Sequence, residues 1–430
     1  MSAARILTIM GSGETAPTMV KLHREVMGRL GAGQHRAVFL DTPFGFQENA
    51  DELCQRTVEY FRQSIGHDLD VAGLLRLVGM DTMQLESALA QLRRAELLFA
   101  GPGSPTYALR QWAGTPVAQI LRDRLSQAGA VTFSSAAALT LGVKTVPVYE
   151  IYKSGIDPFW LDGLNVLAAV DLPVVVIPHY DNAEGGHHDT RFCYLGARRL
   201  AELESALPTD VFVLGVDEHT GVLFDLEAAT ASVWGRGAMT LRRDGESTVV
   251  HAGETVSMDF VRAAGAAGSG SAWGPSAAAL AGLSTAPAAH DDGSASASND
   301  AASLGVATSQ AESAFETAMA NGDATGAAQA ALGLDQTIVE WSRDMLQSDE
   351  MDRARAALRA MIVRLGEAAV GGLRDPRDLL APVVNAALAL RRVVRAEKRY
   401  DLSDLLRDEL AAAGVSVRDT ADGVVWELGG

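Results

Sequence analysis

The sequence has 430 residues, of which 48% are hydrophobic and 21% charged, a composition that suits two or three folded domains. Its net charge of −18 argues against non-specific binding of polyanions by the whole chain. The two cysteines, Cys54 and Cys193, exclude a disulfide scaffold or a cysteine-rich zinc module. No apolar run has the roughly 20 residues of a membrane helix, and Met1–Glu14 lacks the apolar segment of a signal peptide. We therefore expect a cytoplasmic protein without membrane contacts.

The first 262 residues alternate between apolar runs and helical patterns. Strands are expected at Ile6–Met10, Ala37–Asp41, Leu74–Val78, Leu97–Ala100, Ala130–Phe133, Val174–Ile177 and Val211–Gly215. Helices are expected at Met19–Leu30, Ala50–Ser64, Thr82–Arg94, Val117–Ala128 and Thr190–Ser205. This alternation predicts an α/β fold whose parallel sheet is covered on both faces. Short alternating runs after Thr220 predict an antiparallel extension of that sheet.

Residues 263–311 consist mainly of Ala, Gly, Ser and Pro, which predicts a flexible linker between domains 1–262 and 312–430. The last domain reads as mainly helical. Its expected helices are Phe315–Leu332, Gln336–Leu346, Asp352–Glu367, Leu380–Lys398 and Asp401–Ala413. The tail Val415–Leu428 reads as a hairpin that turns at Asp422-Gly423.

In open α/β sheets, sites form at the carboxyl ends of the strands, so the residues that follow strands are the candidates. Ser134-Ser135 follows a predicted strand and precedes the small residues Ala136 and Ala137. A nucleophile elbow needs such small neighbours, but a serine cap on a buried helix has the same pattern. Gly101-Pro102-Gly103-Ser104 follows another strand, where glycines let backbone amides approach a substrate oxygen; an ordinary turn is the alternative.

His179 directly follows the strand Val174–Ile177 and could act as a general base. Either Glu150 or Glu218 could orient it, and either could instead be a solvated loop acid. The neighbouring pair His187-His188 invites a zinc site. However, adjacent loop histidines rarely share one metal ion, so we expect neither a metal nor a cofactor.

Together these segments resemble the dipeptidase E and cyanophycinase family of serine peptidases, which has the class I glutamine-amidotransferase-like fold. The resemblance covers roughly residues 4–225. Its most specific part is Pro178-His179-Tyr180-Asp181-Asn182-Ala183, which is similar to the Pro-His-Phe-x-Asn-Ala segment of that family and continues to Thr190-Arg191.

The resemblance implies a three-layer α/β domain with a catalytic triad. Ser135 would be the nucleophile, His179 the base and Glu150 the acid, while the amides of Gly103 and Ala136 would form the oxyanion hole. We expect Gly101, Ser104, Arg191 and Glu218 to help bind the substrate. The sequence departs from the family pattern at Phe133, Ala137, Pro102 and Ser104.

Residues 312–428 resemble the C-terminal part of cysteinyl-tRNA synthetase, with its helical domain and small anticodon-contacting extension. The residues that carry the resemblance are Lys398, Asp401, Asp404, Arg407-Asp408, Gly414-Val415, Arg418-Asp419-Thr420, Gly423 and Trp426. No motif similar to the His-Ile-Gly-His or Lys-Met-Ser-Lys sequences of the aminoacylating core occurs, so the chain should not form Cys-tRNA by itself.

Arg391, Arg395 and Arg399 recur every four residues and share one helical face, which suits contacts with tRNA phosphates. The alternative is a solvated face whose arginines pair with Asp401, Asp404 and Asp408.

The sequence thus predicts a serine-type hydrolase, peptidase- or amidase-like, that acts on a small peptide, amide or ester and is linked to tRNA or cysteine metabolism. The alternative is a non-catalytic protein that binds tRNA or another protein and carries an inert hydrolase fold. The expected partners are a small substrate, tRNA and a second copy of the chain in a homodimer.

Overall fold

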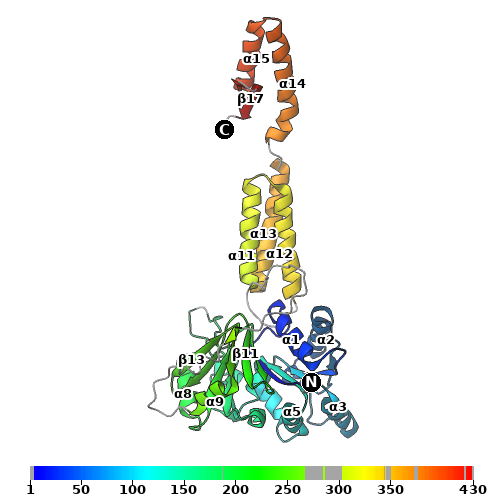
Figure 1. Cartoon of the computed structure of the whole chain (residues 1–430), viewed down its shortest axis with the longest axis vertical. Helices are drawn as coiled ribbons and strands as arrows, with labels where there is room; N and C mark the ends of the chain where they lie inside the picture. The colour runs from blue at the N-terminus through cyan, green and yellow to red at the C-terminus, as the bar shows by residue number, and fades with distance from the viewer. Residues whose placement is uncertain are drawn as a thin grey trace. The chain divides into compact units, whose positions relative to one another are not determined.

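The computed structural model describes residues 4–185, 187–266, 284–285, 303–342, 344, 350–371, 376–420 and 423–428. The chain forms two compact units, which are residues 1–303 with 339–351, and residues 304–338 with 352–430 (Figure 1). The predicted linker differs at both ends, because helix α9 (Met258–Ala266) extends into it and helix α11 begins at Leu304. Most of its interior lies outside the described residues.

The first unit is built on a nine-stranded mixed sheet. Its parallel part contains, in spatial order, β1 (Arg5–Met10), β5 (Gly129–Ser134), β4 (Leu97–Ala100), β2 (Ala37–Leu40) and β3 (Asp70–Val71). Beyond β1, the antiparallel strands are β10 (Thr220–Asp225), β11 (Thr230–Gly235), β14 (Glu254–Ser257) and β15 (Ser284–Thr285). The predicted antiparallel extension after Thr220 is therefore confirmed.

A second sheet pairs the parallel strands β8 (Val174–Ile177) and β9 (Phe212–Val216) with the antiparallel strands β12 (Ala238–Arg243) and β13 (Glu246–His251). Strands β6 (Lys144–Thr145) and β7 (Leu161–Asp162) form a separate short pair. The site described below lies where β8 and β9 end beside the main sheet.

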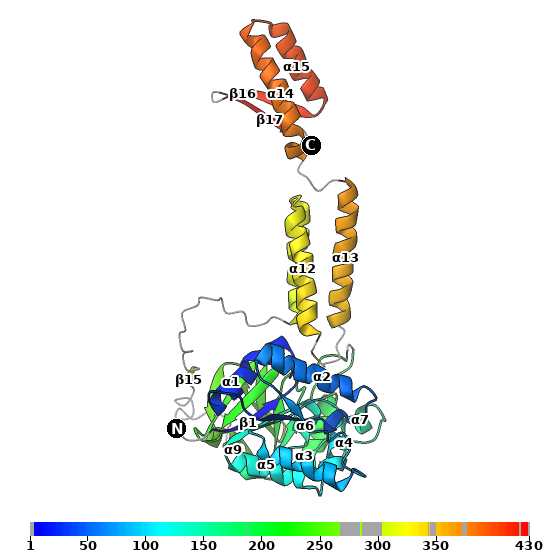
Figure 2. The ribbon, with the colours of Figure 1, turned by 90° about the vertical axis from the view of Figure 1, so that its right-hand side faces the viewer.

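Helices cover both faces of the main sheet (Figure 2). They are α1 (Val20–Leu30), α2 (Ala50–Tyr60), α3 (Thr82–Arg94), α4 (Pro105–Trp112), α5 (Pro116–Ser126), α6 (Ser135–Leu139) and α9. Helices α7 (Val148–Tyr152) and α8 (Gly196–Ser205) pack with β8 and β9 of the second sheet. Short helical turns lie at Pro17–Met19, Thr42–Phe44, Phe61–Ile65 and Val166–Val170.

Alternate strand residues separate two apolar cores. Ile6 and Phe39 pack on the side of α1 and α2, whereas Leu7 and Val38 pack on the side of α3 and α5. Because successive strand side chains point to opposite faces, a nearly all-apolar strand is buried on both sides. This arrangement is the predicted three-layer α/β fold.

Four predicted elements differ from the structure. The helix expected at Gln336–Leu346 is not separate, because its first residues form the end of α12 (Ala324–Trp341). The run Leu74–Val78 is not a strand, and the short strand of that region is Asp70–Val71. The helix expected from Thr190 begins only at Gly196. The helix expected at Phe315–Leu332 is broken at Asn321-Gly322-Asp323, where Gly322 has a positive φ of 69° that a helix cannot contain.

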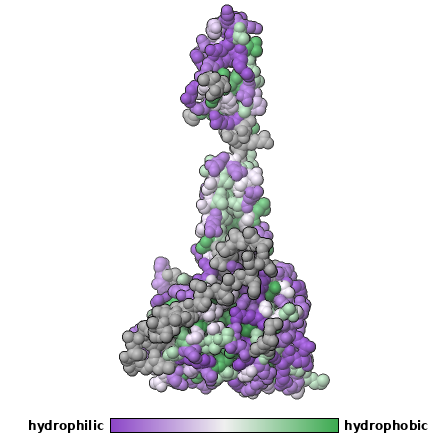
Figure 3. Space-filling model, in the orientation of Figure 1, coloured by the Kyte–Doolittle hydropathy of each residue, from purple (hydrophilic) through white to green (hydrophobic). Residues whose placement is uncertain are grey.

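The second unit contains helices α11 (Leu304–Ala320), α12 (Ala324–Trp341), α13 (Glu350–Gly371), α14 (Pro376–Ala396) and α15 (Tyr400–Ala412), followed by the hairpin β16 (Val415–Thr420) and β17 (Gly423–Leu428). A small core forms where Val384 and Leu388 of α14 meet Val415 of the hairpin. Asp422 of the predicted turn lies outside the described residues. The visible surface over α14 and α15 is mostly hydrophilic, whereas that over α11–α13 is mixed (Figure 3).

Candidate functional site

The parallel strands bring five segments of the first unit to one edge of the fold. These segments are Gly11–Glu14 after β1, Gly101–Ser104 after β4, Ser135 after β5, His179 after β8 and Glu218 after β9. This edge is where ligands bind in open α/β sheets, because the carboxyl ends of parallel strands converge there.

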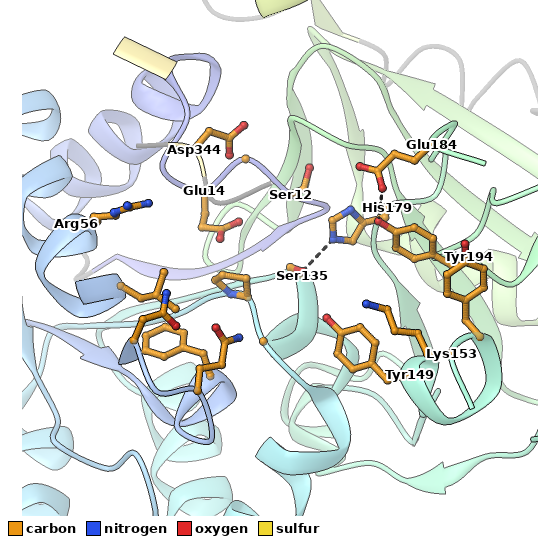
Figure 4. A pocket seen from close by; sticks show the side chains of 18 residues that line it. Ser12, Glu14, Arg56, Ser135, Tyr149, Lys153, His179, Glu184, Tyr194 and Asp344 are labelled. Carbon is orange, nitrogen blue, oxygen red and sulfur yellow. Dashed lines mark hydrogen bonds between the residues drawn. The ribbon is translucent and has the colours of Figure 1, made fainter. Parts of the chain in front are cut away.

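Ser135 and His179 face each other across this edge (Figure 4). Ser135 Oγ lies 2.9 Å from His179 Nε2, and His179 Nδ1 lies 2.8 Å from Glu218 Oε1. The buried Asn182 donates a second hydrogen bond of 2.9 Å to the same Glu218 oxygen. Burial opposes the ionisation of Glu218, but the hydrogen bonds from His179 and Asn182 outweigh it and lower the pKa of this carboxyl. A serine, a histidine and an ionised acid are thus connected in series.

The structure corrects the assignment of Glu150 as the acid beside the histidine. Glu150 lies on α7, where its carboxylate accepts a 3.0 Å hydrogen bond from Thr106 Oγ1. Glu218 occupies the position at Nδ1, so it holds the histidine and does not line the cavity as a substrate-binding residue. The resemblance assigned the acid by its distance along the sequence from the serine. Glu218 instead reaches His179 because it follows β9, which pairs with β8.

The backbone at the reactive groups has left-handed torsion angles. Ser135 and His179 both have φ of 49°, a region that side chains other than glycine rarely adopt. Phe133, which stands where an elbow glycine was expected, points into the core and packs its ring 5.9 Å from Trp112. The bulky residue therefore leaves the serine side of the turn open.

The Gly103 loop lies against the turn that follows β2. A Cβ on Gly103 would lie 2.1 Å from the carbonyl oxygen of Pro43, and its φ of 139° also requires glycine. Gly103 lines the cavity, and Ala136 lies in the first turn of α6, where amides have no intrahelical acceptor. Both amides therefore remain candidates for binding an oxyanion.

Two expected substrate-binding side chains have other partners. The Ser104 hydroxyl caps α4 by accepting a 3.1 Å hydrogen bond from the Tyr107 amide. Arg191 forms two hydrogen bonds of 2.8 and 2.9 Å with Asp189 and does not line the cavity. Gly101 borders the site through its backbone, since a Cβ there would lie 3.3 Å from Glu14 Oε1.

A cavity of about 620 Å³ opens beside Ser135 (Figure 4). Its lining includes Ser12, Gly13, Glu14, Phe44, Gln47, Asn49, Leu53, Arg56, Pro102, Gly103, Ser135, Tyr149, Tyr152, Lys153, His179, Glu184, Tyr194 and Asp344. From the sequence, Gly11-Ser12-Gly13-Glu14 after the first strand could either help bind the substrate or simply form a turn, whereas Tyr149 and Lys153 had no predicted role. The signal that could have found them is their position in the sequence. Glu14 follows the first strand, and Tyr149 and Lys153 lie close to Glu150 of the predicted triad.

The described residues contain neither a metal-binding cluster nor a membrane-spanning helix. No group of three or more His, Cys, Asp or Glu side chains in that part of the chain could hold a metal ion. His188 instead stacks on Tyr152, with 6.2 Å between the ring centres. Within the same described ranges, no helix is long and apolar enough to cross a membrane.

In the second unit, the three aligned arginines are engaged within the protein. Arg391 has only 3% of its side chain exposed and forms hydrogen bonds of 2.8 and 3.0 Å with Asp419 of β16. Arg395 also reaches Asp419, at 2.6 Å, and Arg399 pairs with Asp401 at 3.3 Å. The prediction that Arg391 contacts phosphate is therefore wrong, because its guanidinium joins α14 to the terminal hairpin.

Comparison with known proteins locates one family match and several partial relatives. Residues 377–426 match the model of the cysteinyl-tRNA ligase anticodon binding domain. A cysteine–tRNA ligase from Pseudarthrobacter chlorophenolicus is 37% identical over 113 residues, which cover 25% of this chain and 23% of that protein. The cysteine–tRNA ligase of Paenarthrobacter aurescens is 33% identical over 105 residues, which cover 23% of this chain and 22% of that protein.

Two solved structures resemble the first unit. A peptidase from an acI-B1 Actinobacterium has 19% identity and a TM-score of 0.48, with 59% of this chain and 97% of that chain covered. A protein described as a Peptidase E from Listeria monocytogenes EGD-e has 14% identity and a TM-score of 0.36, with 58% of this chain and 99% of that chain covered. The chain spans less than a quarter of the length of the two cysteine–tRNA ligases that it matches.

Proposed function

We propose that the first unit is a serine hydrolase. The observation that carries this proposal is the series of short contacts from Ser135 Oγ to His179 Nε2, at 2.9 Å, and from His179 Nδ1 to Glu218, at 2.8 Å. A serine hydroxyl needs an adjacent base to become a nucleophile, and the base needs a third group to orient it. The left-handed turn at Ser135 supports the same reading, since strained backbone is typical of a nucleophile elbow.

In the proposed reaction, His179 takes the hydroxyl proton of Ser135 while Ser135 Oγ attacks the carbonyl carbon of the substrate. Glu218 keeps the proton of Nδ1 in place and stabilises the imidazolium that forms. The amides of Gly103 and Ala136 stabilise the oxyanion, and His179 then protonates the leaving group. Water hydrolyses the resulting acyl-enzyme in the same way. The cavity volume of about 620 Å³ favours a small peptide, amide or ester as the substrate.

A fluorophosphonate probe tests this proposal directly, because it reacts covalently with activated serines. The wild-type protein should be labelled, and Ser135→Ala should lose the label. Ser126→Ala is a matched control, since its hydroxyl only bonds the Arg122 carbonyl at the end of α5. Absence of labelling in the wild type would overturn the proposal and favour an inert hydrolase fold with a binding function.

We also propose that the second unit binds tRNA, on the basis of the match of residues 377–426 to an anticodon binding domain. Because Arg391 is paired with Asp419, the exposed basic residues Arg392 and Lys398 are better candidates for phosphate contacts.

Filter binding of tRNA at several salt concentrations tests this second proposal. Each phosphate contact contributes roughly 0.7–0.9 to the slope of log K against log salt concentration, so Arg392→Ala with Lys398→Ala should lower the slope by about one to two. The exposed Arg94 on α3 offers a control, and Arg94→Ala should bind as the wild type does. Binding that is absent or independent of salt would refute the proposal. The homodimer stays a prediction that sedimentation can check.

A further inference from the structure

Glu14 is a buried acid on the cavity wall that the proposed triad does not use. Only 3% of the residue is exposed, and Ser134 Oγ donates a 2.6 Å hydrogen bond to its Oε2 atom. In Figure 4 the carboxylate lies to the left of Ser12 and Ser135, and Tyr149 and Lys153 line the cavity on the other side of Ser135. This places a carboxylate within the space that a substrate would enter.

The loop that carries Glu14 is fixed on both sides. The Gly11 amide donates to the Thr220 carbonyl at 2.9 Å, and His23 Nε2 lies 2.8 Å from the Glu14 carbonyl oxygen. A Cβ on Gly13 would lie 2.3 Å from the ring of His219, so only glycine allows this approach. The carboxylate is therefore held in place before a ligand arrives, which lowers the entropy cost of binding.

The nearby His179 offsets only part of the cost that burial imposes on the ionised form of Glu14. Among the described residues, no arginine, lysine or histidine forms an ion pair with its carboxylate. His23 bonds the main chain only, and burial lowers the pKa of this histidine to about 4, so it is uncharged near neutral pH. Burial raises the pKa of Glu14 itself, while the hydrogen bond from Ser134 opposes this effect. A buried acid without an ion-pair partner is costly, and a cationic ligand would reduce that cost.

Glu14 is also close to the groups that would bind the reacting carbonyl. Its Oε2 atom bonds Ser134, the residue before the nucleophile, and its Oε1 atom faces Gly101, at the start of the oxyanion loop. Because Gly101 has no side chain, the carboxylate can lie between the two segments. A group bound by Glu14 would thus belong to the acyl half of the substrate.

We propose that Glu14 is a specificity residue that binds a positively charged nitrogen on the acyl half of the substrate. This inference rests on the proposed hydrolase function of Ser135. The nitrogen could be a free α-amino group or a side-chain amine, since both carry the same charge.

Three p-nitroanilides distinguish these sources. Glycine p-nitroanilide carries a free α-amino group. Nα-acetyl-lysine p-nitroanilide carries only a side-chain amine, and Nα-acetyl-glycine p-nitroanilide carries neither. The wild type should prefer one of the two charged substrates to the neutral one. Glu14→Gln keeps the size and a hydrogen-bond acceptor but not the charge. In this variant, kcat/KM for the preferred substrate should fall about 10- to 100-fold, and that for the neutral one by less than about threefold.

Glu184 is the matched control, because it also lines the cavity but lies at an exposed position, where it accepts a hydrogen bond from Tyr194. Glu184→Gln should keep the preference for the charged substrate. Equal cleavage of all three compounds by the wild type, or an unchanged preference in Glu14→Gln, would overturn the inference. Labelling by fluorophosphonate without cleavage of either charged substrate would overturn the inference alone. Failure of labelling together with failure of all cleavage would instead refute the hydrolase proposal on which it rests.

Discussion

Two acids near the site, Glu218 and Glu150, give opposite predictions for the same chemical change. Glu218→Gln replaces the carboxylate at His179 Nδ1 by an amide, whereas Glu150→Gln changes only the acceptor of the Thr106 hydroxyl. The two substitutions remove the same charge and keep nearly the same volume. Any difference between them must therefore come from the partner of each carboxylate.

The expected loss for Glu218→Gln follows from its contacts. The carboxylate accepts hydrogen bonds of 2.8 Å from His179 and 2.9 Å from Asn182, and 18% of its side chain is exposed. Loss of a hydrogen bond to a charged group costs about 1.5–3 kcal/mol, or about 10- to 150-fold in rate. An amide can also donate to Nδ1 and so favour the tautomer that carries its proton on Nε2, which extends the loss towards about 10⁴-fold.

The assay is the second-order rate constant of fluorophosphonate labelling, with Ser135→Ala as the background. We expect a decrease of about 10²- to 10⁴-fold for Glu218→Gln and less than about twofold for Glu150→Gln. Thermal unfolding of both variants checks that the fold is retained. A Glu218→Gln rate within about threefold of the wild type, or an equal loss in Glu150→Gln, would refute the assignment of Glu218 as the orienting acid.

Three further predictions concern stability. Glu14→Gln should raise the melting temperature near neutral pH and change it little below about pH 4, because burial raises the pKa of Glu14 above the value of about 4.3 in the unfolded chain, so its cost appears only as pH rises above that value. A lower melting temperature near neutral pH would contradict this. Arg391→Met should reduce the free energy of unfolding in urea by about 1–2 kcal/mol. This is less than the roughly 3–5 kcal/mol lost when a fully buried ion pair is broken, because Asp419 is half exposed. A reduction below about 0.3 kcal/mol would contradict the structural role of this pair. Its contribution should decrease as pH falls below about 3.9, since Arg391 and Arg395 lower the pKa of Asp419, whereas Asp419→Asn should remove that pH dependence in the same titration. Gly103→Ala should abolish fluorophosphonate labelling and lower the melting temperature, since its Cβ would meet the Pro43 carbonyl at 2.1 Å; a fully active variant would refute the need for glycine there.

Much of the fold could be predicted because the strands of the first unit are buried on both faces. Such strands appear in the sequence as continuous apolar runs, and β4 and β8 lie at the predicted residues. The strand prediction at Leu74–Val78 is wrong because this segment is irregular. Its residues Leu74 and Leu77 are buried in the core without strand pairing. Burial requires apolar residues in that run, but it does not determine whether the backbone is a strand.

The site could be predicted only in part. Ser135 and His179 follow strands directly, so topology alone places them at one edge of the fold. The choice between Glu150 and Glu218 depends on how the chain returns through the second sheet, which spacing along the sequence does not encode. The same limit applies to Arg391, whose spacing suits a phosphate stripe but whose partner, Asp419, lies on a hairpin later in the chain.

The junction between β5 and α6 gives two successive serines separate roles. Ser134 holds the buried acid Glu14, while Ser135 turns towards His179. One peptide bond thus joins the proposed nucleophile to the serine that holds the proposed charge-selecting acid, so a shift of the turn would move both. New substrate preferences would then arise more readily on the opposite wall, where Tyr149 and Lys153 can change without disturbing the turn.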